Sequence, residues 1–349
     1  MAVIEISILP RHQHGEAGLG PVEELGLFSN EGNGELLVPD DAELHFLRRP
    51  QDRPAFPWNL NQGINSFVPY QNSRLGPFCR WLQRQFPDGS LPDANIFTSR
   101  TTLLQIAAAP YIREKFTLLI IRYQGRLFIT RKVEDMPMTD QQLRWQYFGS
   151  KVKDFFVVDA SGRLQLNHGP DANRTCSRIL KRTIGNHSIL FTSRVGAVDP
   201  HTNAYVILKQ RPLPAGSRKQ EKERRFWKQR AVKWYLQAAL AHQQRIYSAL
   251  RDSAGYVSEG SIEEYGLEEL KERAVELRFW KAELPQVCFN FLNSALQLIR
   301  DTVTEDDAHQ VWLLEKKEGA FRLTAPIRME EAENDLHIFL PQSFVRAFS

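Results

Sequence analysis

The clearest pattern of apolar and polar positions along the chain predicts a β-hairpin. Two runs rich in β-branched and aromatic residues, Phe116–Tyr123 and Arg126–Val133, are separated only by Gln124-Gly125. A two-residue link that ends in glycine suits a tight turn, because glycine adopts a positive φ without steric cost. We therefore predict two antiparallel strands joined at this link.

Further strands are predicted wherever similar runs lie between turn signals. Two of them flank a Gly-Asn-Gly turn near the N-terminus, and two others are joined at Gly185-Asn186. The predicted strands are Glu24–Ser29, Glu35–Asp41, 173–184, 188–198, 204–211, Val311–Leu314 and Ala320–Ala325.

Helical periodicity and capping signals place helices between these strands. Thr139 and Gln142 form a capping box for a helix that runs to about Val158. Because strands and helices do not alternate regularly, we expect an α+β fold with mixed, twisted β-sheets flanked by helices. The other predicted helices begin near Pro77 or span Ser99–Ala109, 218–240, Ile262–Glu276 and 285–303.

The distribution of glycine, proline and polar residues suggests one domain preceded by an arm. Residues 10–24 and 50–72 are rich in Gly, Pro, Asn and Gln and are expected to be irregular. We therefore predict an irregular N-terminal arm over 1–23 and a single domain over 24–349, a size that buries a sizeable core.

Bulk composition excludes few functions. A hydrophobic content of 42% and a charged content of 25% are ordinary for a globular protein, and a net charge of +4 only permits nucleic-acid contact. The three cysteines lie far apart, which favours a reducing compartment over a zinc site. No apolar run approaches the roughly 20 residues of a membrane helix. We expect a soluble intracellular protein without membrane contact.

The stretch from Lys209 to Lys233 is a candidate nucleic-acid surface. It holds ten Lys and Arg residues against two acids, with aromatic residues interleaved. Basic and aromatic groups together suit single-stranded RNA, through phosphate attraction and base stacking. The alternative is a solvated helix face, with Trp227, Ala231, Trp234 and Ala238 packed in the core. The candidate RNA-binding residues are Arg224, Arg225, Lys228 and Lys233.

A series of segments in a fixed order resembles the Rai1/DXO family of RNA 5′-end processing nucleases. The resemblance covers roughly residues 20–349 and implies the fold of that family. The supporting segments are ELGLFS, SRTTLLQIAAAPY, GRLFI, YFGSKVKDFF, IGNHSILFTSRVGAVDP, YVILK, KWYLQAAL, VCFNFLNSAL and FLPQSFV.

In that family, acidic residues from one helix and two strands hold divalent metal ions. A pair of hard cations with oxygen ligands stabilises the attacking and leaving oxygens at phosphorus. The helix motif G-h-K-h-E corresponds here to Gly149–Lys153, and the strand motifs E-h-D and E-h-K correspond to 194–196 and 207–209. The matched positions are Arg100, Lys153, Arg194, Gly196, Ile207, Lys209 and Gln237.

Four family acids are thus replaced by Lys153, Arg194, Gly196 and Ile207, so four negative charges give way to two positive ones. The resemblance therefore implies that no catalytic residue and no Mg²⁺ or Mn²⁺ site is retained. The remaining cations either grip a phosphate directly or have drifted without function. The alternative is an active site rebuilt from the nearby acids Asp154, Asp159 and Asp199, which we expect to lie off the pocket face.

Three classes of function follow from the resemblance. The favoured one is a catalytically inactive member that binds single-stranded RNA 5′ ends or RNA-processing partners in the nucleus. Similarity to an insect germline member of the family that has lost its metal ligands implies protection of uncapped piRNA precursors. It also implies the Rhino and Deadlock chromatin proteins as partners. The alternatives are an active decapping or 5′–3′ exonuclease with shifted ligands, and a scaffold for an exonuclease or a chromatin-bound complex.

Overall fold

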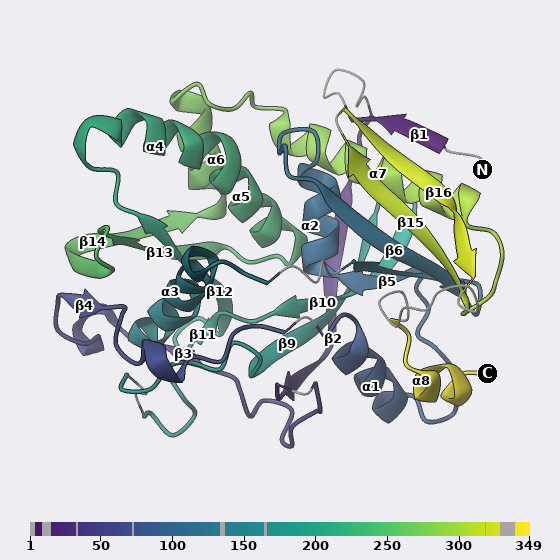
Figure 1. Ribbon diagram of the computed structural model, residues 1–349, viewed down its shortest axis with the longest axis horizontal. Coiled ribbons are helices and arrows are strands. Elements are labelled where there is room, and N and C mark those ends of the chain that lie inside the picture. The colour runs from purple at the N-terminus through teal and green to yellow at the C-terminus, as the bar shows by residue number, and fades with distance from the viewer. Residues whose placement is uncertain are drawn as a thin grey trace.

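The computed structural model describes residues 4–8, 15–32, 34–71, 73–132, 137–163, 166–317, 319–328 and 339–349. The strands of these residues form two twisted sheets, which helices flank (Figure 1). Both sheets contain parallel as well as antiparallel pairs, so the predicted α+β class with mixed sheets is confirmed.

The first sheet runs in the order β1-β16-β15-β6-β7-β5-β10-β9-β2. Both predicted tight turns occur in it: β6 pairs with β7 around Gln124-Gly125, and β9 pairs with β10 around Gly185-Asn186. Its strands are β1 (Ile4–Ser7), β2 (Leu19–Asn30), β5 (Ile96–Ser99), β6 (Phe116–Tyr123), β7 (Arg126–Arg131), β9 (Thr175–Ile184), β10 (His187–Arg194), β15 (Gln310–Lys317) and β16 (Ala320–Arg328).

The second sheet runs in the order β4-β14-β13-β12-β11-β3-β8. Figure 1 shows β13 and β14 on the side of the molecule away from β1, β15 and β16. Its strands are β3 (Phe46–Leu47), β4 (Trp58–Asn59), β8 (Val157–Val158), β11 (Ala197–Asp199), β12 (Ala204–Pro212), β13 (Arg245–Arg251) and β14 (Tyr256–Gly266).

Two of the helices, α2 and α3, begin at capping signals that the sequence contains. Ser99 accepts from Thr102 N at the start of α2, and the Thr139/Gln142 capping box opens α3 as predicted. The helices are α1 (Gly76–Gln85), α2 (Arg100–Ala108), α3 (Asp140–Phe156), α4 (Lys219–Arg225), a π-helical turn (Phe226–Arg230), α5 (Ala231–Leu240), α6 (Leu267–Glu276), α7 (Leu284–Thr302) and α8 (Gln342–Ala347).

Three apolar cores hold these layers together. Successive residues of β6 alternate between two of them: Leu118 packs with α2, α5 and α7, whereas Leu119 packs with α1 and α8 on the opposite face. The third core joins Phe148 and Val152 of α3 to the second sheet. Helix α3 therefore covers the second sheet and α2 lies against the first, while α5 packs against α2 and against β13 of the second sheet.

Three predictions about the strands were wrong. The arm is not irregular throughout, because Ile4–Ser7 forms β1 on β16 and β2 already begins at Leu19. Glu35–Asp41 forms no strand beyond one bridge at Leu36. The run 188–198 is divided between two sheets, since β10 ends at Arg194 and β11 begins at Ala197.

Two predictions about the helices also need correction. The basic helix over 218–240 is interrupted by the π-helical turn Phe226–Arg230. The segment Ile262–Glu276 is not helical throughout, because its first residues complete β14 and α6 begins only at Leu267. None of the helices in the described parts of the chain is long and apolar enough to cross a membrane.

Candidate functional site: a basic cavity between the two sheets

All seven pocket residues predicted from the family motifs line one cavity of about 620 Å³. We call it the basic cavity. Its walls come from the start of α2, the middle of α3, the link between β10 and β11, the middle of β12 and α5. The seven residues are Arg100, Lys153, Arg194, Gly196, Ile207, Lys209 and Gln237.

The cavity exists because the chain crosses between the sheets at Val195-Gly196. β11 pairs with β12 only as far as Ala197 opposite Val206, so the edge of β12 beyond Val206 is left to line the cavity. The backbone at Gly196 lies close to this edge. A Cβ atom there would stand 2.5 Å from the Val206 carbonyl oxygen, a separation that real Cβ atoms essentially never show. Only glycine fits this crossing, so the aspartate of the family motif has no room here.

Four of these seven residues are cations: Arg100, Lys153, Arg194 and Lys209. The first two to consider are Arg100 and Lys209. Arg100, at the first turn of α2, is buried and donates to Gln243 Oε1 at 2.5 Å and to the Arg194 carbonyl at 3.1 Å. Lys209 Nζ donates to Gln237 Oε1 at 2.7 Å. These acceptors are neutral, so they orient the two cations without neutralising them.

The other two cations occupy positions of family acids. Lys153 lies on the cavity-facing side of α3, one turn after Gly149. The Arg194 guanidinium lies over the Tyr70 ring, 4.8 Å from its centroid, where a cation–π attraction holds it. Arg194 is exposed to solvent where it lines the cavity.

Enclosure lowers the pKa of all four cations. Loss of hydration lowers the pKa of Arg100 to about 9 and that of Lys209 to about 7, and neighbouring arginines add to both effects. The pKa values of Lys153 and Arg194 are lowered for the same reason. Among the described residues, no carboxylate forms an ion pair with any of the four. Asp154 and Glu43 stabilise the charge of Lys153, but lost hydration and the nearby Arg194 outweigh them, so a bound anion would stabilise this cluster.

The neighbouring Lys151 has a different role. Its side chain is fully buried, and Nζ donates to Asp154 Oδ2 at 3.1 Å and to the carbonyl oxygens of Leu166 and His168 at 2.6 and 2.8 Å. Lys151 therefore ties α3 to the loop that forms one rim of the cavity and offers no free charge to a ligand.

The expectation that nearby acids avoid the pocket was wrong for two of three. Asp154 and Asp159 line the cavity, whereas Asp199 lies in β11 and accepts from His201 N at 3.0 Å. Two acids that the sequence motifs did not indicate, Glu43 and Asp171, also line it. Both lie in loops, and no local sequence pattern predicts that these loops pack beside the cavity.

Each of the four acids at the cavity is already engaged. Glu43 pairs with Arg174 at 2.7 Å, and Asp154 pairs with Lys151. Asp159 and Asp171 accept from the backbone N–H groups of the turns that follow them. Burial raises the pKa of Asp154 to about 6, although Lys151 opposes this shift.

These residues do not fit the metal pair of the family. The positions that would supply carboxylates hold lysine, arginine, glycine and isoleucine, and the crossing at Gly196 has no space for a side chain. In the described part of the chain, no three His, Cys, Asp or Glu side chains lie together as a metal site would require. At the positions of the family ligands, a divalent cation would meet positive charge or apolar side chains instead of carboxylate oxygens.

A second cavity of about 330 Å³ adjoins the first. It shares Arg100, Thr175, Arg194 and Gln237 with the basic cavity, and Tyr70 stands on its wall beneath Arg194. The same two arginines therefore face both spaces. Tyr70 was missed because it lies in an irregular loop far from the motif residues in sequence.

The predicted RNA-binding helix has its cations outside and its aromatic residues inside. Arg224, Arg225 and Lys228 are exposed, and Lys233 pairs with Glu114. The four interleaved aromatic residues are all buried in the core, as the alternative interpretation expected, so they cannot stack on bases. These aromatic residues are Phe226, Trp227, Trp234 and Tyr235.

Two mixed sheets that meet at a basic cavity define an α+β protein with a polar site at the crossing between its sheets. The chain belongs to the family described as "RAI1 like PD-(D/E)XK nuclease", whose model matches residues 21–345. It is 26% identical to the decapping and exoribonuclease protein of Bos taurus, over 93% of this chain and 84% of the relative, and 25% identical to that of Homo sapiens, over 93% and 85%.

Solved structures show the same fold. Rai1 of Scheffersomyces stipitis superposes with a TM-score of 0.78 at 15% identity, over 99% of this chain and 97% of that one. Rai1 of Candida albicans, solved in complex with pU5-Mn²⁺, has a TM-score of 0.78 at 16% identity, over 99% and 98%. The Rai1/DXO family proposed from the sequence motifs is thus confirmed.

Proposed function

We propose that this protein is a catalytically inactive Rai1/DXO member that binds the 5′-phosphate end of single-stranded RNA without a metal ion. The observation that carries this proposal is a set of four cations that line one cavity and form no ion pair with a carboxylate among the described residues: Arg100, Lys153, Arg194 and Lys209. An RNA 5′ phosphate supplies the negative charge that this cluster lacks.

The chemistry of the substitutions supports this reading over simple loss of function. Replacing acids by small neutral residues alone would empty the site, but Lys153 and Arg194 reverse the sign of its charge. In an enclosed site, ammonium and guanidinium groups form charge-assisted hydrogen bonds with phosphate oxygens. The cations then take the charge role that metal ions hold when acids surround them.

The relatives support an RNA ligand. Rai1 of Candida albicans has been solved with pU5, and the mammalian relatives are decapping and exoribonuclease proteins. Those names also support the alternative of an active enzyme with relocated ligands. The pairing of Asp154 with Lys151 opposes that alternative, because such an acid must first release its partner.

The biological setting is proposed from the sequence resemblance alone. Inverted charge at the family's acidic positions is similar to the insect germline protein Cutoff. On that basis we propose a nuclear role in protecting uncapped piRNA-precursor transcripts, with partners of the Rhino and Deadlock type or a 5′–3′ exonuclease. A scaffold that binds only such proteins is the remaining alternative.

The binding proposal is tested with a 3′-labelled, single-stranded ten-nucleotide RNA carrying either a 5′ monophosphate or a 5′ hydroxyl, in the presence of EDTA. We expect the phosphorylated RNA to bind more tightly. Replacing Lys153→Glu and Arg194→Glu should weaken its binding at least about tenfold, because both cations contact the phosphate. Fluorescence anisotropy measures the dissociation constants.

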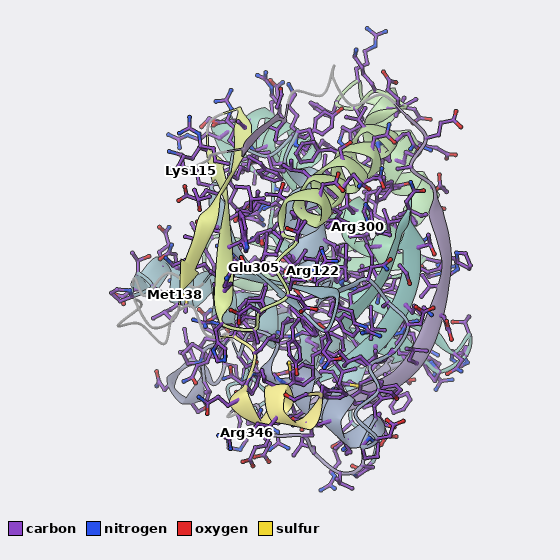
Figure 2. The ribbon with its side chains drawn as sticks, turned by 90° about the vertical axis from the view of Figure 1, so that its right-hand side faces the viewer. Lys115, Arg122, Met138, Arg300, Glu305 and Arg346 are labelled. Carbon is purple, nitrogen blue, oxygen red and sulfur yellow. The ribbon has the colours of Figure 1, made fainter. Side chains whose placement is uncertain are left out.

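The matched control carries Arg300→Glu and Arg346→Glu, which change the net charge equally but do not line the basic cavity; Figure 2 shows them on α7 and α8. If the protein binds both RNA ends with equal affinity, or if the cavity variant keeps its affinity, the proposal fails. The scaffold that binds only proteins is then the remaining function. Turnover of capped, triphosphorylated or monophosphorylated RNA with Mg²⁺ or Mn²⁺ that disappears in Asp154→Asn would establish the active alternative.

A further inference from the structure

A second group of cations lies around Phe148 of α3, outside the residues that line the basic cavity. The guanidinium carbons of Arg144 and Arg251 both lie over the ring of Phe148, at 5.3 and 4.7 Å from its centroid. These two carbons are therefore at most about 10 Å apart. Like charges held this close repel each other, so the arrangement needs a stabilising partner.

Arg251 is the buried centre of this group. It is 7% exposed, donates from Nε to Gln210 Oε1 at 3.0 Å and from Nη1 to the Asp252 carbonyl oxygen at 3.2 Å. Arg144 donates to Asn61 Oδ1 at 3.0 Å. These acceptors are neutral, and among the described residues neither arginine forms an ion pair with a carboxylate.

The π-helical turn brings a third arginine into this group. Arg230, the last residue of that turn, is exposed, and its charge acts on Arg251 strongly enough to help lower the pKa of that guanidinium. Burial is the main cause of the shift, and Arg144 contributes to it, while Asp252 opposes it. Three cations from α3, β13 and the π-helical turn therefore share one electrostatic field.

This group is continuous with the basic cavity in the fold. Along α3, Gly149 lines the cavity, and Trp145 lies one helical turn before it on the same face of the helix. Trp145 is 50% exposed, an unusual state for so large an apolar side chain, and it adjoins Arg144.

We propose that Arg144 and Arg230, with the charge of the buried Arg251 beside them, bind the phosphodiester backbone of single-stranded RNA beyond its 5′ end, and that Trp145 is a stacking surface for a base. This inference rests on the proposed function, since it extends the path of an RNA whose 5′ phosphate lies in the basic cavity. Spaced cations beside an exposed aromatic ring match the chemistry of sequence-tolerant single-strand binding.

The test compares two ligands in EDTA: a 5′-phosphorylated dinucleotide, which fills only the basic cavity, and a 5′-phosphorylated ten-nucleotide RNA. We expect Arg144→Glu plus Arg230→Glu to weaken the binding of the longer RNA about tenfold and to leave the affinity for the dinucleotide unchanged. The salt dependence of longer-RNA binding should also fall, by roughly one unit of slope for each phosphate that the variant no longer neutralises. Trp145→Ala should weaken the binding of the longer RNA without changing the slope of its salt dependence.

Both variants change exposed residues, and thermal unfolding checks that they fold. The control is again Arg300→Glu plus Arg346→Glu, whose positions in Figure 2 lie on the face of α7 and α8. If the unaltered protein binds neither ligand, the proposed function fails. If it binds the dinucleotide, but the longer RNA gains no affinity or the Arg144→Glu, Arg230→Glu variant loses none, this inference alone is overturned.

Discussion

At the scale of single residues, Gly196 decides more about the cavity than any charged side chain. The acid-to-base replacements at Lys153 and Arg194 change the charge of the site but leave the backbone free to hold a carboxylate. The crossing at Gly196 does not, because its backbone packs directly against Val206. Reversing the charges alone is therefore insufficient to rebuild a family metal site.

We predict that Gly196→Asp lowers the free energy of unfolding by roughly 1–3 kcal/mol, the usual cost of overpacking. Even combined with Lys153→Glu, Arg194→Glu and Ile207→Glu, it should confer no Mn²⁺ binding, as measured by isothermal titration calorimetry. Gly196→Ala is the control: an equal loss of stability shows that the Cβ atom, not the charge, is responsible. Tight Mn²⁺ binding by the quadruple variant would contradict the prediction.

Lys209 should make the proposed phosphate binding sensitive to pH. Burial lowers its pKa to about 7, and a bound phosphate raises it again by stabilising the charged form. Binding is therefore linked to proton uptake above pH 7. Below about pH 6 the phosphate itself loses negative charge.

We accordingly predict that affinity for 5′-phosphorylated RNA is greatest between about pH 6 and 7 and falls as the pH rises above 7. Anisotropy titrations from pH 5.5 to 9 measure this profile. In Lys209→Arg the charge persists at high pH, so the decline should flatten. A profile that is the same in both proteins would assign the pH dependence to another group.

At the scale of elements, α3 is positioned by Lys151, a buried lysine whose ammonium group donates only to acceptors within the protein. Lys151 ties the helix to the 166–168 loop, so the cavity rim and Lys153 are held in one arrangement. Removing its ammonium group leaves Asp154 and two carbonyl oxygens without their donor.

We predict that Lys151→Met destabilises the protein by roughly 3 kcal/mol, because it leaves a buried carboxylate unpaired. Chemical denaturation measures the free energy of unfolding. Lys228→Met, at an exposed position of the π-helical turn, is the matched control and should change stability by less than about 0.5 kcal/mol. Equal effects of the two changes would show that the hydrogen bonds of the buried Lys151 ammonium contribute little.

At the scale of the whole molecule, two sheets converge on one site whose charge favours anions over metal ions. A ligand that binds only the folded state stabilises it in proportion to the logarithm of its concentration over its dissociation constant. The thermal stability of the protein thus reports which kind of ion the basic cavity takes.

We predict that Mn²⁺ and EDTA leave the melting temperature unchanged, whereas a saturating 5′-phosphorylated dinucleotide raises it by a few degrees. Differential scanning fluorimetry checks both. The Lys153→Glu, Arg194→Glu variant should lose the shift, while Arg300→Glu, Arg346→Glu should keep it. Stabilisation by Mn²⁺ would point to a metal site that the cations do not exclude.

The sequence by itself determined the elements with strong local signals and the residues of the basic cavity. The hairpin at Gln124-Gly125 and the capping box of α3 depend only on neighbouring residues. The residues that the family resemblance indicated all line one cavity.

Only the tertiary structure decided what surrounds those residues. It divided the run 188–198 between two sheets, brought Glu43, Tyr70 and Asp171 to the cavities, and turned the aromatic residues of the basic helix into core. It also placed Arg144 and Arg251 over one ring. These contacts join residues far apart in the chain, so they depend on packing between elements, which no local periodicity encodes.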